Sequence, residues 1–134
     1  MMLDINFQNI QAFTPHNSYL VCPSNYCNIK PNEISPNYNL PATQLIEAWQ
    51  KMLKQEPRVQ LLSTSPDKLQ YFYVQRTLVF RFPDYISVRF IPLNPNETTL
   101  AIYSHAKYGK YDFGVNKKRV TRWLSLLSQF INKK

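Results

Sequence analysis

The chain of 134 residues contains only two glycines, Gly109 and Gly114, and they lie five positions apart. At average usage of about 7%, a chain of this length would hold about nine. Where glycine is so scarce, we expect each one to occupy a position that needs a positive φ or has no room for a side chain. The two glycines therefore predict a tight corner in the backbone, and this corner constrains the fold more than any other feature.

The predicted corner joins an alternating run, residues 98–105, to a run with helical spacing, residues 115–132. It is basic, with Asp112 as its one acidic residue between positions 104 and 119. The cations are Lys107, Lys110, Lys117, Lys118 and Arg119. Asp112 can accept hydrogen bonds from backbone N–H groups in the turn, and Asn116 can cap the helix that follows.

Two interpretations of this corner remain open. In the structural one, Gly109, Asp112, Gly114 and Asn116 hold the corner together with Asp84 from a preceding strand, and Arg119 pairs with Asp84 or Asp112. In the functional one, four residues frame an anion or carboxylate site near a helix N-terminus. These ligand-binding candidates are Ser104, Lys107, Lys110 and Arg119.

The corner resembles the signature of the domain-of-unknown-function 1499 family, approximately Ser-x-Ser-Arg-x-Gly-x-x-Asp-x-Gly-x-Asn-x-x-Arg. The residues that match in register are Ser104, Gly109, Asp112, Gly114, Asn116 and Arg119, while Ala106 and Lys107 replace the second Ser and the Arg. Cys22-Pro-Ser-Asn-Tyr-Cys27 and Phe82-Pro-Asp84 are similar to two further family motifs. The resemblance implies a small domain that is often exported or lipid-anchored in bacteria, and it implies no particular activity.

Cys22 and Cys27 are too far apart for a Cys-x-x-Cys redox motif and lack a second pair for zinc. They form either a disulfide across a small loop or two free thiols that pack as small apolar groups. The oxidising compartment that the family resemblance implies favours the disulfide.

The alternation and spacing of apolar residues predict a single α+β domain over residues 40–134, in the order α-β-β-β-β-α. The expected helices cover residues 40–56 and 115–132, and the expected strands cover residues 58–63, 68–80, 84–91 and 98–105. Short connections favour a four-stranded antiparallel meander with both helices on one face. Residues 1–39, rich in Asn and Pro, predict an extended N-terminal arm packed on this body.

An aromatic set on the expected strands resembles in outline the sheet of a single-strand RNA reader. It consists of Tyr71, Tyr73, Tyr85 and Tyr103, interleaved with Arg89 on the face away from the aliphatic core. The alternative is that the N-terminal arm covers these rings, because the arm's own apolar residues need a surface to contact. We expect the arm to cover them.

The net charge of +8 is uneven, with 13 basic and four acidic residues after position 56. This uneven charge indicates either a surface that binds an anionic partner or a basic surface that is only solvated. Neither a metal site nor a cofactor motif is expected, and no run of residues is apolar enough for a membrane helix. The N-terminal residues do not resemble a signal peptide, so either the protein is cytosolic or an export segment preceded them, whereas the family resemblance suggests the envelope or periplasm.

These features together favour a non-enzymatic envelope or interaction module that binds an anionic ligand or partner through its basic corner, residues 104–122. A nucleic-acid-binding domain is the alternative. A hydrolase or transferase that uses Asp84 and Asp112 as acid and base is a third hypothesis.

Overall fold

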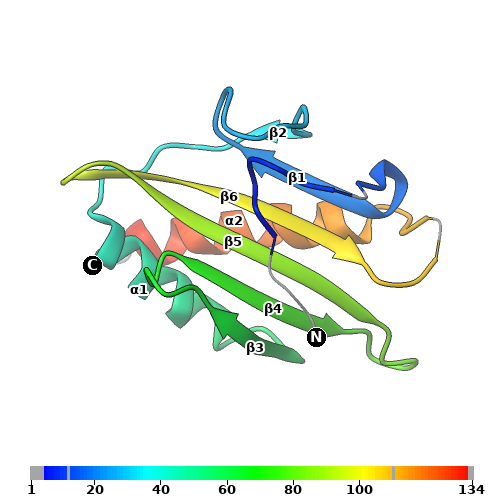
Figure 1. The fold of residues 1–134 in the computed structure, drawn as a ribbon. Coiled ribbons are helices and arrows are strands. Elements are labelled where there is room, and N and C mark those ends of the chain that lie inside the picture. Colours follow the sequence, from blue (N-terminus) through cyan, green and yellow to red (C-terminus); the bar gives the residue numbers. More distant parts are fainter. Residues whose placement is uncertain (1–4, 12, 110, 133–134) are drawn as a thin grey trace.

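The computed structural model describes residues 5–11, 13–109 and 111–132, and in this part of the chain two helices lie on one face of a six-stranded sheet (Figure 1). The strands are β1 (Ser18–Cys22), β2 (Glu33–Ile34), β3 (Val59–Thr64), β4 (Gln70–Arg76), β5 (Pro83–Asn94) and β6 (Glu97–Ala106). The helices are α1 (Ala42–Leu53) and α2 (Val115–Asn132), and a short 3-10 helix, η1 (Pro15–Asn17), precedes β1. The strand order is β2-β1-β6-β5-β4-β3.

The α+β class is confirmed, but the expectation of a four-stranded antiparallel meander is wrong. Strands β3 to β6 do form such a meander, and β1 extends it by pairing antiparallel with β6, from Ser18 opposite His105 to Val21 opposite Ile102. The two-residue β2 then pairs in parallel with β1, which makes the sheet mixed. Part of the expected arm is therefore sheet. These two strands were not predicted because both are short, and because β1 pairs with β6, which lies far along the chain.

The main core lies between the sheet and the two helices. Trp49 of α1 and Trp123 of α2 are fully buried and meet edge to face, with ring centroids 5.9 Å apart. Strand residues Ile86, Val88 and Ile102 pack against them, as the alternation in β5 and β6 predicts. Burial of this apolar surface is the main force that holds the helices on the sheet.

Strand β4 presents its tyrosines to the helices, which corrects the expected aromatic face. Tyr71 and Tyr73 belong to the core on the helix side, where Trp49 Nε1 donates a hydrogen bond of 3.0 Å to the Tyr73 hydroxyl. Phe72 points to the opposite face and stacks on Tyr85. Both faces of β4 are apolar, so the sequence alone could not determine which set faces the helices.

The face away from the helices is partly covered by the chain that precedes β1. Phe7 and Ile10 are buried there against Leu20, Cys22 and Tyr103. The ring of Phe13 also lies near Tyr103, with centroids 6.0 Å apart. The N-terminal segment thus shields part of the sheet that would otherwise expose aromatic surface.

The sulfur atoms of Cys22 and Cys27 lie within disulfide-bonding distance, and their Cα atoms are 6.3 Å apart. Cys22 is the last residue of β1 and is fully buried. The pair closes the loop that leaves β1 before the chain returns to form β2.

Candidate functional site

Arg119 lies in the second turn of α2, and all three nitrogens of its guanidinium group donate hydrogen bonds. Its Nε donates to Gln75 Oε1 at 2.5 Å, and Nη2 donates to Asp84 Oδ2 at 2.6 Å. Its Nη1 donates to Asn116 Oδ1 at 2.7 Å and to Ser104 Oγ at 3.1 Å. Arg119 therefore pairs with Asp84, one of the two carboxylates expected for it.

This ion pair is buried, since the side chains of Arg119 and Asp84 are 8% and 7% exposed. Asp84 lies at the start of β5 and is paired in register with Gln75 near the end of β4, while Ser104 lies on β6. One guanidinium thus joins α2 to three adjacent strands. Because a buried charge without a partner is strongly destabilising, each member of the pair depends on the other.

Asn116 links the same network to the chain before β1. Its Nδ2 donates to the Asn17 carbonyl at 3.1 Å and to Asp112 Oδ2 at 2.7 Å, and its Oδ1 accepts a bond of 2.6 Å from the Ser104 hydroxyl. The expected helix cap comes from Asp112 instead, whose carboxylate accepts the backbone N–H groups of Gly114 and Asn116. Asn116 is the second residue of α2 and is fully buried.

Both glycines adopt the backbone conformation that their scarcity predicts. The φ angles are +91° at Gly109 and +82° at Gly114. The carbonyl of Gly109 accepts a hydrogen bond of 2.9 Å from Asn17 Nδ2, and the carbonyl of Gly114 accepts one of 2.9 Å from the Lys118 N–H. Together with the φ of +53° at Phe113, these angles direct the chain from β6 into α2, and the Asn17 side chain holds the Gly109 carbonyl.

The four ligand-binding candidates do not lie in equivalent environments. Ser104 and Arg119 belong to the buried network, and their polar groups are occupied by protein partners. Lys107 is exposed, with Nζ 5.4 Å from the centroid of the Tyr108 ring, and Lys110 lies outside the described residues. The sequence also gave no sign of Gln75 and Asn17, because both reach the network from positions distant along the chain.

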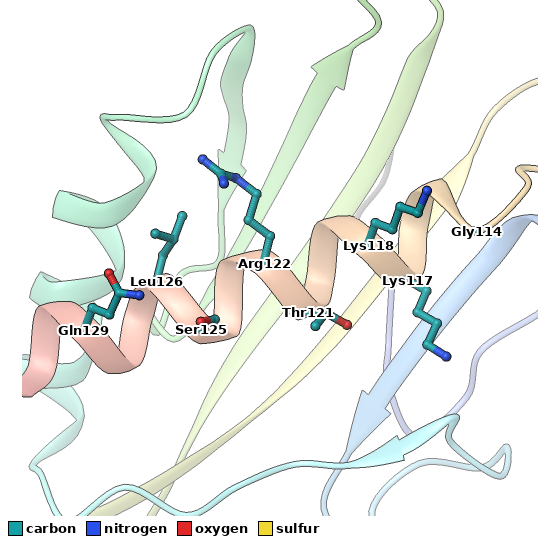
Figure 2. A pocket seen from close by; sticks show the side chains of 8 residues that line it. All are labelled: Gly114, Lys117, Lys118, Thr121, Arg122, Ser125, Leu126 and Gln129. Carbon is teal, nitrogen blue, oxygen red and sulfur yellow. The ribbon is translucent and has the colours of Figure 1, made fainter.

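A shallow groove runs along the outward face of α2 (Figure 2). Its lining residues are Gly114, Lys117, Lys118, Thr121, Arg122, Ser125, Leu126 and Gln129. In Figure 2, the side chains of Lys117 and Lys118 project from the helix near Gly114. The lining contains three cations and no carboxylate, so the groove is electrostatically suited to an anion.

Arg122 also takes part in an ion pair at the edge of this groove. Its Nη2 lies 3.0 Å from Glu56 Oε2, and Trp123 Nε1 donates to Glu56 Oε1 at 2.8 Å. The hydrogen bonds from Arg122 and Trp123 together lower the pKa of the Glu56 carboxyl from its usual value. Arg122 is thus partly neutralised, whereas Lys117 and Lys118 form no ion pair with any described residue.

The described part of the chain contains neither a group of metal-binding side chains nor a membrane-spanning helix. Residues 5–11, 13–109 and 111–132 contain no group of three or more His, Cys, Asp or Glu side chains placed to hold a metal ion. No helix within the same ranges is long and apolar enough to cross a membrane. His105 stacks on Tyr103, and burial lowers its pKa from the usual value.

Comparison with known proteins identifies a family. Residues 8–127 match the model of a family described as "Protein of unknown function (DUF1499)", which confirms the resemblance seen at the corner. No curated protein and no solved structure matches the chain.

The buried ion pair predicts a large difference between neighbouring cations of α2. Arg119→Ala should lower the free energy of unfolding by about 3 kcal/mol, because it leaves the Asp84 carboxylate buried without its partner. Lys118→Ala removes an exposed cation and should change this free energy by less than about 0.5 kcal/mol. Urea denaturation of the two variants measures both values, and equal effects would contradict a structural role for Arg119.

The corner predicts a cost of backbone conformation at Gly114. A Cβ at this position would meet no atom within 4 Å, so steric contact with neighbours is not the constraint. Gly114→Ala should nonetheless lower the free energy of unfolding by about 1–2 kcal/mol, because a residue with a Cβ is strained at this φ.

Gly114→Asn is the matched control, since Asn tolerates the left-handed region better than Ala does. Its loss in the same urea titration should be smaller than that of Gly114→Ala. If Asn were the worse substitution, the positive φ would not be what selects glycine at this position.

Proposed function

Since the chain belongs to the DUF1499 family, whose function is unknown, we propose a function from its own geometry: a non-enzymatic module that binds an anionic partner through its basic corner, residues 104–122. The observation that carries this proposal is the contrast between buried and exposed cations. Arg119 is committed to Asp84, whereas Lys107, Lys117 and Lys118 are exposed and form no ion pair among the described residues.

The buried network supports the exposed lysines without contacting the partner. Asp112 fixes the start of α2, and Lys117 and Lys118 are the third and fourth residues of that helix. Lys107 is held at the end of β6, where its backbone N–H donates to the Pro83 carbonyl at 3.2 Å. In this proposal Ser104 and Arg119 position the basic surface, and the lysines and the groove of α2 contact the anion.

The other two hypotheses gain less support. Tyr85 and Tyr103 are buried, which leaves them poorly placed to stack on bases. The carboxylates of Asp84 and Asp112 are both hydrogen-bonded within the protein, to Arg119 and to the start of α2. Neither a nucleic-acid platform nor a pair of catalytic carboxylates is therefore our proposal.

The proposal predicts that the position of the charges matters beyond their number. The combined variant Lys107→Glu, Lys117→Glu and Lys118→Glu should elute from immobilised heparin, a generic polyanion, at a clearly lower salt concentration than the unmodified chain. The reason is that it converts the proposed contact surface from basic to acidic.

The control variant carries Lys30→Glu, Lys51→Glu and Lys68→Glu, three exposed lysines outside residues 104–122. It has the same net charge as the first variant, so overall charge cancels from the comparison. It should elute at a higher salt concentration than the first variant. Equal elution of both would show that retention follows net charge, and the proposed basic surface would be rejected.

A further inference from the structure

Two loops at one end of the sheet expose large apolar side chains. These loops are the β4–β5 connection and the β6–α2 connection, which lie at the same end of the molecule in Figure 1. The exposed fractions are 71% for Leu78, 76% for Val79, 74% for Phe80, 51% for Phe82, 58% for Tyr108 and 90% for Phe113. Contiguous apolar exposure of this kind marks an interaction site in a soluble domain.

Direct contacts join the two loops into one surface, which we call the apolar tip (Leu78, Val79, Phe80, Phe82 and Tyr108). Phe80 and Phe82 stack with centroids 5.5 Å apart, and Tyr108 meets Phe82 edge to face at 6.3 Å. The hydrogen bond from the Lys107 N–H to the Pro83 carbonyl fixes the second loop beside the first.

The β4–β5 turn lacks the residue types that turns usually favour. The turn sequence Thr-Leu-Val-Phe-Arg-Phe, residues 77–82, contains none of the usual turn formers Gly, Pro, Asn and Asp. Its ends are joined by the Thr77 N–H to the Phe82 carbonyl at 3.0 Å and by the Phe82 N–H to Thr77 Oγ1 at 2.9 Å. These hydrogen bonds involve only backbone groups and the Thr77 hydroxyl, so formation of the turn does not require its apolar side chains.

Cations are interspersed with the residues of the apolar tip. Arg76 immediately precedes the β4–β5 turn, Arg81 lies within it and Lys107 precedes Tyr108, while residues 76–82 contain no acidic side chain. Helix α2 begins at the same end of the molecule, and Lys117 and Lys118 lie in its first turn. An apolar tip with a basic rim is complementary to a bilayer whose headgroups are anionic and whose acyl region is apolar.

We infer that the apolar tip inserts into the surface of a membrane rich in anionic lipid, with the surrounding cations against the headgroups. This inference rests on the proposed function and names the anionic partner as a lipid surface. A convex turn with exposed side chains is suited to enter a fluid layer. Association of two copies through this end would bring like charges together, on a chain whose net charge is +8.

Flotation with lipid vesicles tests the inference. The full chain is mixed with vesicles of phosphatidylcholine alone, or of phosphatidylcholine containing about one-third phosphatidylglycerol. The chain should float with the anionic vesicles and much less with the neutral ones, and added salt should weaken this binding because it screens the charges.

The decisive variant combines Leu78→Ser, Val79→Ser and Phe80→Ser. It should reduce partitioning onto the anionic vesicles at least about tenfold, because it removes most of the apolar surface available for insertion. The matched control combines Leu61→Ser, Leu62→Ser and Leu93→Ser, which are exposed apolar residues outside the apolar tip (49%, 40% and 48% exposed). This control should float like the unmodified chain.

A fluorescent reporter tests insertion directly. The native Trp49 and Trp123 are 0% and 1% exposed, so their emission should be little affected by vesicles. In a Phe80→Trp variant, anionic vesicles should shift the added emission to shorter wavelength as the indole leaves water.

Several results would overturn the inference. Equal flotation of the apolar-tip variant and its control would exclude insertion, as would an unshifted emission from Phe80→Trp. If the unmodified chain forms dimers that the apolar-tip variant lacks, and does not float, the apolar tip is a self-association surface. Absent flotation together with position-dependent heparin elution would reject the lipid surface and leave the proposed function standing. If heparin elution also follows net charge alone, both fail.

Discussion

The buried pair of Arg119 and Asp84 is the interaction on which the arrangement of this end of the molecule depends. Its two side chains are 8% and 7% exposed, and the guanidinium also bonds Gln75, Ser104 and Asn116. Burial of two charges is costly, and the surrounding hydrogen bonds offset that cost only when the helix and the strands are correctly placed. The pair therefore favours one arrangement of α2 against β4, β5 and β6, the one in which both charges and their hydrogen bonds have partners.

The corner and the exposed surface follow from this constraint. With α2 fixed, the chain must leave β6 and enter the helix within a few residues, and the positive φ angles of Gly109 and Gly114 allow that path. Asp112 then satisfies the first N–H groups of α2. The same path leaves Lys107, Lys117 and Lys118 exposed, and the Lys107 N–H bonds Pro83, next to the apolar β4–β5 turn. The buried polar network and the exposed basic and apolar residues at this end of the molecule are thus two consequences of one connection, and the proposed binding to an anionic lipid surface uses the exposed residues.

Much of this could be predicted from local sequence patterns, and the rest depends on contacts that such patterns do not contain. Helix α2 and the inward residues of β5 and β6 follow from periodicity, and the glycine positions from scarcity. Strands β1 and β2 are too short to show a period. The two faces of β4 are both apolar, so its sequence does not show which of them packs against the helices. Gln75 and Asn17 joined the network from distant positions. The exposure of Leu78, Val79 and Phe80 was also missed, because an apolar run beside a strand is normally interpreted as core.

A double-mutant cycle measures whether Arg119 and Asp84 act as one structural unit. The free energy of unfolding would be determined by urea denaturation for the unmodified chain, for Asp84→Asn, for Arg119→Gln and for the double variant. The expected coupling energy is about 2 kcal/mol or more, because either single change leaves the other group buried without its charged partner. Additive effects, within about 0.5 kcal/mol, would show that the two groups contribute independently and are not one structural unit.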